Sequence, residues 1–381
     1  MTRFIFNETS YFGWGARESL TKEIKDRGFK KALLVTDETI MNVGITGKVS
    51  DLLDKEQLEY IIFNEVKSNP TIAQVKRGLK ICKKYHCDYI LAVGGGSVID
   101  TAKAIGIVMN NPEYKDIKSL SGLSETNNKS LPLIALPTTF GSAAETTINY
   151  IITDSSETVK MVCVNSKSIP VLSIIDSELM SGMPASVAAA TGMDALTHAM
   201  ECYITKAHNE MSDMFALKAM NLIYNNLESA VNKDKEAIEK MAYAEYIAGM
   251  GFSNAGLGIV HSMAHQLGAM YDTPHGVANG LLLPYILKWN GEVCQKRFKD
   301  MGIALGLDVE DINGMEVVTK VSDAIKDLAD RLDVPNHIKL VGGKEADIPV
   351  LAKKAFNDPC TMGNPRNTSV EEFEELFKIA F

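Results

Sequence analysis

Histidines and an aspartate in the second half of the chain have the residue types and the spacing of a metal site. Asp194 and His198 are four residues apart in an alanine-rich run that is typical of a helix. His261 and His265 repeat this spacing, and His275 follows a short distance along the chain. Because residues four apart lie on one face of an α-helix, each pair directs its side chains the same way. We therefore expect these side chains to form a metal-binding site.

The donor atoms of this group suit a divalent transition metal. One carboxylate oxygen with two or three neutral imidazole nitrogens forms a coordination shell that leaves a position for substrate. A zinc-protease helix is excluded, because Ser262 stands where that motif requires a general-base glutamate after His261. A single histidine is more often held by ordinary hydrogen bonds. The clustering of several histidines with an acid favours the metal.

Residues 272–279 predict the start of a helix that carries His275. Thr273 is the expected N-cap, and Pro274 the first helical residue, where its missing N–H group costs nothing. We also expect residues 251–254, Gly-Phe-Ser-Asn, to interrupt the helices before the histidine pair, and residues 359–366 to form a loop.

The length and composition of the chain exclude several classes of protein. With 381 residues it should form about two domains, and 46% apolar and 23% charged residues are ordinary for a globular protein. The net charge of −9 argues against nucleic-acid binding, which needs clustered basic residues. No apolar run reaches the roughly 18 residues of a membrane span, and the start does not resemble a signal peptide. We expect a cytoplasmic protein.

The cysteines give no disulfide framework. They are scattered and include no C-x-x-C pair: Cys82, Cys87, Cys163, Cys202, Cys294 and Cys360. We expect free thiols.

The first half of the chain alternates short β-rich runs with helical runs. Strands are expected at 31–37, 58–63, 88–93, 131–137, 147–153, 159–164 and 171–176, with a helix at 72–86. This alternation predicts a parallel, Rossmann-like sheet whose ligands bind at the carboxyl ends of the strands. Afterwards the periodicity is helical, at 211–231, 234–250, 256–270, 275–289, 315–332 and 370–380. The sequence thus predicts an α/β domain at 1–183 and an all-α domain at 184–381.

The beginning of the chain is rich in aromatic residues, at 4–6 and 11–14. An exposed aromatic strand at a terminus usually pairs with another strand. Pairing within the chain is the expected arrangement, and pairing across a dimer is the alternative.

A glycine-rich turn follows the strand at 88–93. Gly94, Gly95 and Gly96 let a backbone approach a pyrophosphate, and the helix behind them offers N–H donors and a partial positive charge. The turn is not the G-x-G-x-x-G fingerprint of dinucleotide-binding folds. Ser97 and Asp100 also fit a capping box, with Ser97 as the N-cap, and both roles can coexist.

Two further segments follow strands of the same predicted sheet. Asp37 ends the first strand of the α/β run, where an acid accepts hydrogen bonds from the ribose of NAD and repels the 2′-phosphate of NADP. Asp37 is equally well explained as the N-cap of the next helix. The hydroxyl-rich turn at 138–142 is expected to contact the cofactor.

Taken together, these motifs resemble the iron-dependent (group III) alcohol dehydrogenase family. The resemblance is carried in order by Gly94-Gly-Gly-Ser-x-x-Asp100, Pro137-Thr-Thr, Gly192-x-Asp-Ala-x-x-His198, His261-x-x-x-His265 and Pro274-His-Gly-x-x-Asn279. It extends from near the N-terminus to Asn364-Pro-Arg366, and so covers almost the whole chain.

The resemblance implies a dehydroquinate synthase-like fold with a nucleotide-binding α/β domain, a helical domain, an active site between them, and a homodimer. It implies that an iron ion, or zinc, binds to Asp194, His198, His261 and His275. It implies that NAD binds near Asp37, Asn69, Gly95, Gly96, Ser97, Asp100, Thr138, Thr139, Ser142, Asn149 and Lys160. It implies that Asn149, Phe252 and Cys360 border the substrate, and that His265 is a catalytic residue near the nicotinamide that helps relay a proton.

Two residues depart from patterns common in that family. Phe140 stands where many relatives have a small residue in the cofactor turn, so its ring is expected to narrow the pocket or to change cofactor affinity. Val98 stands where some relatives have proline, which a helix start tolerates easily.

The implied reaction is reversible hydride transfer between NAD(H) and a small alcohol or aldehyde. The similarity is greatest to members that interconvert lactaldehyde and 1,2-propanediol, and 1,3-propanediol, ethylene glycol and butanol are alternative substrates. A dehydroquinate synthase-like lyase would need clustered Lys and Arg residues near the metal, and residues 190–280 contain no such cluster. A metal-dependent hydrolase would leave the glycine turn unexplained.

Overall fold

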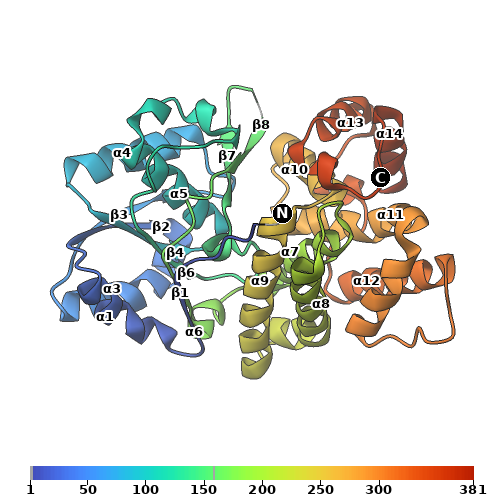
Figure 1. The fold of residues 1–381 in the computed structure, drawn as a ribbon, viewed down its shortest axis with the longest axis horizontal. Coiled ribbons are helices and arrows are strands. Elements are labelled where there is room, and N and C mark those ends of the chain that lie inside the picture. The colour runs from blue at the N-terminus through green and yellow to red at the C-terminus, as the bar shows by residue number, and fades with distance from the viewer. Residues whose placement is uncertain (1–2, 158) are drawn as a thin grey trace. The chain divides into compact units, whose positions relative to one another are not determined.

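The computed structural model describes residues 3–157 and 159–381, which divide into two compact units, Met1–Met183 and Pro184–Phe381 (Figure 1). The first unit contains strands and helices, and the second, which is described throughout, contains only helices as regular elements. The prediction of an α/β half followed by an all-helical half is confirmed.

A six-stranded sheet forms the centre of the first unit. Its order is β1-β9-β6-β4-β2-β3, and every neighbouring pair is parallel. The strands of this unit are β1 (Thr9–Phe12), β2 (Lys31–Asp37), β3 (Glu59–Val66), β4 (Tyr89–Gly94), β5 (Gly122–Leu123), β6 (Leu133–Pro137), β7 (Asn149–Asp154), β8 (Val159–Val164) and β9 (Leu172–Ile175). β1 pairs with β9 of the same chain, so the N-terminal strand is paired internally as expected.

Helices cover both faces of this sheet (Figure 1). They are α1 (Leu20–Asp26), α2 (Glu38–Asn42), α3 (Ile45–Lys55), α4 (Ile72–Lys84), α5 (Gly96–Asn110) and α6 (Ser177–Met180). Leu33 and Val35 of β2 join the core beneath α4 and α5, whereas Ala32 and Leu34 join the core beneath α1 and α3. Successive side chains of a strand point to opposite faces, which explains why the parallel strands are apolar without interruption.

A smaller sheet, with the order β5-β8-β7, departs from the all-parallel expectation. β7 and β8 are antiparallel, and Asp154 pairs with Val159 at the turn between them. A parallel connection needs a crossover of a dozen or more residues, which this short turn cannot provide. The strands themselves lie where the sequence predicted them.

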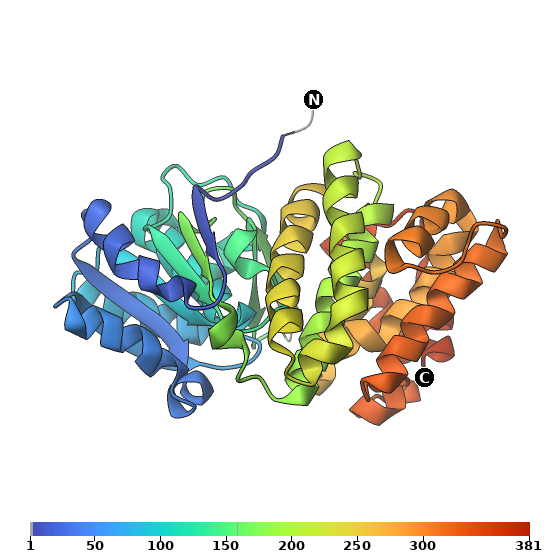
Figure 2. The ribbon, with the colours of Figure 1, turned by 90° about the horizontal axis from the view of Figure 1, so that it is seen from below.

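The second unit is a set of packed helices, seen from another side in Figure 2. They are α7 (Ala185–Ile204), α8 (Glu210–Val231), α9 (Lys235–Ala255), α10 (Ile259–Tyr271), α11 (His275–Leu305), α12 (Met315–Arg331), α13 (Ile348–Phe356) and α14 (Val370–Ile379). The predicted interruption at 251–254 is wrong, because α9 continues through these residues to Ala255. Gly251 is a packing residue there, since a Cβ at this position would lie 3.1 Å from the Cys202 sulfur.

Small residues let helix α7 approach its neighbours closely. A Cβ at Gly192 would lie 2.1 Å from a methyl group of Leu227 on α8. A Cβ at Gly276, on α11, would lie 2.2 Å from the backbone oxygen of Ala190 on α7. Both distances are far below van der Waals contact, and at Gly276 the neighbour is backbone, so that position requires glycine for the packing observed. The two glycines therefore allow α7 to pack closely on α8 and on α11, which carries His275.

Two predicted helix starts are wrong in detail. α11 begins at His275 with Pro274 as its N-cap residue, and the buried Thr273 hydroxyl caps nothing. α5 begins at Gly96 with Gly95 as its N-cap residue, so Ser97 and Asp100 form no capping box. In both places the helix begins without a side-chain cap. His275 nevertheless lies in the first turn, as predicted.

Among the residues that the structure describes, no helix is both long enough and apolar enough to cross a bilayer. The six cysteines are free, as expected.

Candidate active site

Three helices bring the four proposed metal ligands together. α7 carries Asp194 and His198, which are each 4% exposed, and α10 carries His261, which is 1% exposed. His275 is the first residue of α11 and is half-buried. One ligand atom from each of these residues lies within 4.8 Å of the others. The predicted convergence is confirmed for this set.

The separations within the group are those of a coordination shell. Asp194 Oδ1 lies 3.7 Å from His275 Nε2 and 4.0 Å from His261 Nε2. Ligands that hold one ion tetrahedrally at about 2.1 Å would be about 3.4 Å apart. The two separations exceed this value by about 0.3 and 0.6 Å, so the donor atoms would move closer together around an ion.

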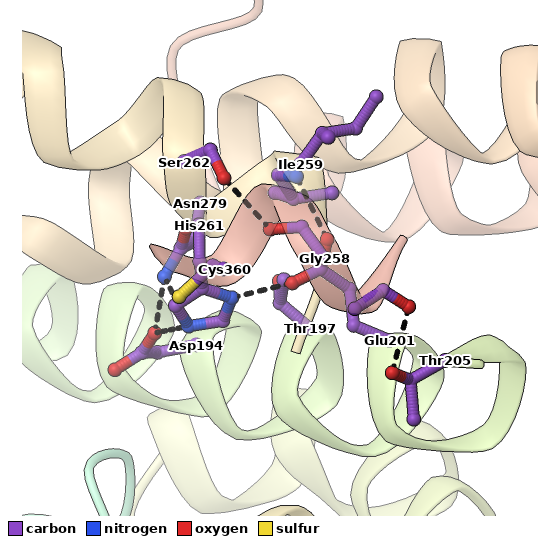
Figure 3. Close-up of polar contacts among 12 residues, drawn as sticks. Asp194, Thr197, Glu201, Thr205, Gly258, Ile259, His261, Ser262, Asn279 and Cys360 are labelled. Carbon is purple, nitrogen blue, oxygen red and sulfur yellow. Dashed lines mark hydrogen bonds and ion pairs between the residues drawn. The ribbon is translucent and has the colours of Figure 1, made fainter. Parts of the chain in front are cut away.

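The side chain of Asn279 shows where these donor atoms converge. Its Nδ2 lies 2.6 Å from Asp194 Oδ1 and 3.2 Å from Nε2 of both His261 and His275. Figure 3 shows the contacts that the Asn279 amide nitrogen makes with Asp194 and with the His261 ring. A carboxylate oxygen and two imidazole nitrogens that face one point, among side chains that are buried or half-buried, are the donor set that a cation requires. The residues present fit a divalent ion.

Aromatic stacking fixes the orientation of His198. The Phe252 ring is stacked on the His198 imidazole, with centroids 4.1 Å apart and planes 13° apart. The His261 ring lies against the same imidazole at 4.6 Å. Phe252, which was expected to border the substrate, is thus 4% exposed and packs directly on a ligand.

His265 lies outside the group of four and belongs to a second one with Asp358 and Cys360. Its Nδ1 lies 2.8 Å from Asp358 Oδ2, and its ring stacks parallel to that of His275 with centroids 5.5 Å apart. The other carboxylate oxygen of Asp358 accepts a hydrogen bond from the Cys360 backbone N–H group at 2.9 Å. Asp358 therefore orients the imidazole of His265 and the short 3₁₀ turn that carries Cys360.

The surroundings of Cys360 disfavour the ionised form of its thiol. Burial, followed by the negative charges of Asp358 and Glu201, raises the pKa of Cys360 well above its ordinary value. A neutral thiol is a poor nucleophile. Cys360 can line a site, but it has no tendency to attack a substrate.

In the first unit, the glycine turn and the 138–142 turn lie against each other. A Cβ at Gly96 would lie 2.8 Å from the Ser142 side chain, and one at Gly95 would lie 3.3 Å from the Thr139 hydroxyl. The Thr138 N–H group donates to the Gly94 carbonyl at 3.2 Å. Both turns follow neighbouring parallel strands, β4 and β6. Their close approach and the uncapped start of α5 fit a pyrophosphate, which binds to backbone N–H groups at such a helix end.

Asp100 connects this turn to the small sheet. Its Oδ2 accepts a hydrogen bond from the Ile151 N–H group of β7 at 2.9 Å. Burial raises the pKa of Asp100, and the nearby positive charges of Lys103 and Lys160 oppose that shift. The contact explains how Asn149, the first residue of β7, and Lys160 of β8 are held near the turn.

Lys103 is a buried charge that the sequence did not single out. Its Nζ donates to the Thr147 carbonyl at 2.7 Å, to the Thr147 hydroxyl at 3.0 Å and to the Asn149 carbonyl at 2.8 Å. Burial lowers the pKa of Lys103, and the neighbouring Asp100 carboxylate opposes that shift. Lys103 therefore fixes the segment that leads into β7.

The two remaining cofactor candidates lie after β2 and β3. Asp37 Oδ1 accepts a hydrogen bond from the Ile40 N–H group at 2.9 Å, so the N-cap reading of Asp37 is confirmed. Asn69 has φ 55°, in the left-handed region that asparagine tolerates better than most residues. The Pro70 carbonyl accepts from the Thr153 N–H group at 2.7 Å, which ties this turn to β7.

Phe140 does not project from the cofactor turn. Its side chain is fully buried in the first unit. The ring is therefore not exposed at the surface of the turn, and an effect of Phe140 on cofactor affinity stays a prediction.

Two carboxylates of the site were missed in the sequence. Glu201 lies 2.6 Å from His261, and Asp358 contacts His265 as described. Glu201 follows Asp194 by seven residues, so helical spacing places it on the ligand face of α7. Nothing in the sequence around Asp358 indicates its partner, which is 93 residues away.

Comparisons with known proteins match nearly the whole chain. A family model described as "Iron-containing alcohol dehydrogenase" matches residues 7–177, and one described as "Fe-containing alcohol dehydrogenase family, C-terminal" matches residues 188–381. Lactaldehyde reductase of Escherichia coli strain K12 is 47% identical over 379 residues, which cover 100% of this chain and 99% of that protein.

Solved structures share the fold. A 1,3-propanediol oxidoreductase has a TM-score of 0.96 at 38% identity, with 100% of both chains covered. The sulfoacetaldehyde reductase of Bifidobacterium kashiwanohense in complex with NAD+ has a TM-score of 0.89 at 26% identity, with 100% of this chain and 98% of that chain covered.

Proposed function

The chain belongs to the iron-containing alcohol dehydrogenase family, and from that premise we propose that it transfers hydride reversibly between NAD(H) and a small alcohol or aldehyde. The observation that carries the proposal is the buried group of Asp194, His198, His261 and His275. When bound, a divalent ion supplies Lewis-acid charge and the nicotinamide donates or accepts the hydride.

The residues proposed to bind NAD belong to the first unit, and those proposed to bind the metal belong to the second. In the first unit, the residues proposed to hold NAD are Asp37, Asn69, Gly95, Gly96, Ser97, Asp100, Thr138, Thr139, Ser142, Asn149 and Lys160. In the second unit, the four clustered side chains would hold iron, or zinc in its place. Asn149, Phe252 and Cys360 are proposed to border the substrate. The NAD+ complex of the sulfoacetaldehyde reductase supports the choice of cofactor.

We propose lactaldehyde and 1,2-propanediol as the substrate pair. Support comes from the lactaldehyde reductase relative, whereas the 1,3-propanediol oxidoreductase of the same fold supports other short diols. Steady-state rates for a panel of small alcohols, with NAD and with NADP and iron-loaded enzyme, test the proposal. The highest kcat/KM is expected for 1,2-propanediol with NAD. Activity that needs no nicotinamide would overturn the proposed reaction.

The choice of iron is tested by the metal content of anaerobically purified protein. Three imidazoles and a carboxylate suit either iron or zinc. We expect activity of the metal-free protein to be restored most fully by ferrous iron when each ion is added in turn. Full restoration by zinc alone would assign zinc instead.

Asp37 is proposed to determine the preference for NAD over NADP. Asn caps helices as well as Asp does, so Asp37→Asn should keep the bond to Ile40 while removing the charge. Loss of repulsion toward a 2′-phosphate should raise the NADP-to-NAD ratio of kcat/KM by about tenfold. Glu38→Gln removes a charge from the adjacent residue and serves as the control. Equal ratios in the two variants would exclude Asp37 from the ribose site.

His265 is proposed to help move the proton that accompanies hydride transfer. His265→Ala should lower kcat by about a hundredfold with the bound metal retained. Added imidazole should restore part of the lost activity, because it supplies the missing ring. Unaffected activity, or a loss that imidazole does not relieve, would leave His265 with only a packing role beside His275.

A homodimer is also proposed, with β1 at the contact, because β1 lies at one end of the six-stranded sheet. Light scattering coupled to size exclusion should give twice the mass of the 41.6 kDa chain.

A further inference from the structure

We propose that Glu201 is a positioning residue of the metal site, which holds the His261 ring in the tautomer whose Nε2 is free to bind the ion. The inference rests on the metal binding of the proposed function, but not on its substrate or its reaction. Glu201 is not itself a ligand in this proposal, because it contacts the far side of the ring.

The carboxylate of Glu201 has a donor on each oxygen. Its Oε2 lies 2.6 Å from His261 Nδ1, and its Oε1 accepts a hydrogen bond from the Val260 backbone N–H group at 2.7 Å. Glu201 is 1% exposed, so solvent does not compete for these contacts. Carboxylate oxygens are hydrogen-bond acceptors, so the short contact to Oε2 favours a proton on Nδ1 of the His261 ring. Nε2 then has its lone pair free.

The contacts on the opposite side of the ring fit the same tautomer. Asn279 Nδ2 lies 2.6 Å from Asp194 Oδ1, which can only accept, so the amide N–H₂ group faces this way. The same Nδ2 lies 3.2 Å from His261 Nε2. The second hydrogen of the amide can go to a ring nitrogen, so a lone pair on His261 Nε2 fits this contact. Figure 3 shows His261 between Glu201 on one side and Asp194 with Asn279 on the other.

The position of Glu201 in α7 explains how it acts on the site. Asp194, His198 and Glu201 lie at intervals of four and three residues, which places them on one face of the helix. A single helix therefore presents two ligands and the group that orients a third. Metal-binding histidines commonly donate their other ring N–H to such a carboxylate, which fixes the ring and makes the ligand more basic.

Glu201 also supplies the cap that helix α10 lacks. α10 begins after Gly258 without a side-chain cap of its own, and the Val260 N–H group is one of the first-turn donors that have no partner within the helix. The partial positive charge of a helix N-terminus favours a carboxylate there. A Cβ at Gly258 would lie 2.8 Å from Glu201 Oε1, so only glycine allows the approach. The same carboxylate thus fixes the helix and the imidazole that the helix carries.

Metal affinity without turnover tests the proposal. Glu201→Gln keeps the size of the side chain but leaves only one acceptor for two donors. The affinity for Co²⁺, measured by competition with a chromophoric chelator, should fall by about ten- to a hundredfold. The visible absorption of bound Co²⁺ should also change, because it reports the geometry of the ligands. Glu228→Gln makes the same exchange on the surface of α8 and should bind Co²⁺ like the wild-type protein.

A measurement on the wild-type protein covers the case in which Glu201→Gln does not fold. Histidine ring nitrogen NMR of the metal-free protein should show the His261 proton on Nδ1, and a proton on Nε2 would overturn the proposal. Equal Co²⁺ affinity and absorption in wild type and Glu201→Gln would also overturn it, while leaving the proposed function intact. Failure of the wild-type protein to bind any divalent metal would remove both.

Discussion

Replacement of Asp194 by asparagine is expected to reduce alcohol oxidation by at least about a thousandfold, which corresponds to roughly 4 kcal/mol. Asp194 supplies the only carboxylate among the four clustered ligands, and its Oδ1 lies within 4.0 Å of Nε2 of both His261 and His275. Asparagine has nearly the same shape but no charge. The variant therefore tests the charge of the site rather than its packing.

Metal analysis of the purified protein and steady-state kinetics measure this prediction together. We expect Asp194→Asn to contain little iron or zinc and to unfold at a temperature close to that of the metal-free wild type. Asp323→Asn makes the same exchange on α12, where Asp323 forms an exposed ion pair with Lys288 of α11. This variant should retain both metal and activity. Wild-type activity in Asp194→Asn would contradict the metal site itself.

The ligand group was predictable because helical spacing is a local property. Asp194 and His198, and likewise His261 and His265, share a helix face whatever the rest of the fold does. The parallel strands were predictable for a similar reason, since strands buried on both faces are apolar without interruption. In these places one periodicity determines both the secondary structure and the burial.

The parts that sequence reasoning missed depend on contacts between distant segments. Asp100 was expected to cap its own helix, but its carboxylate binds the Ile151 N–H group, 51 residues along the chain. Thr273 was expected to cap α11, yet the helix begins without a side-chain cap. The side chain of a capping residue can accept a hydrogen bond from a nearby or from a distant N–H group. The sequence alone does not show which distant N–H groups lie within reach.

The packing role of two glycines was not predicted from the sequence. Gly251 was read as a break, but it lies within α9 where a larger residue would meet Cys202. Gly276 is another example, because the sequence gives it no role beyond following His275. In the structure α11 packs tightly on α7 at this residue, with the Ala190 oxygen 2.2 Å from where a Cβ would lie.

Gly276→Ala is therefore expected to damage both stability and metal binding. The added methyl would overlap the backbone of Ala190, which cannot turn aside as a flexible side chain would. Overpacking of this kind typically costs about 1–3 kcal/mol of unfolding free energy. The start of α11 must move away from α7, and His275 moves with it, away from Asp194. We expect Co²⁺ affinity to fall by at least about tenfold, or roughly 1.4 kcal/mol.

Gly47→Ala separates this effect from the general consequence of exchanging glycine for alanine. Gly47 lies inside α3, and a Cβ there would meet nothing within 4 Å. Alanine in a helix interior is favoured over glycine by about 0.5–1 kcal/mol, so this variant should resist denaturant slightly better than wild type. Unfolding by urea, with and without Co²⁺, measures both variants. Gly276→Ala could unfold at the same urea concentration as the wild-type protein and bind Co²⁺ with the same affinity. That result would show that α11 does not depend on this contact to place His275. A stability loss with unchanged Co²⁺ affinity would show that His275 reaches the ion from a displaced helix, so the four ligands would tolerate more movement than their burial implies.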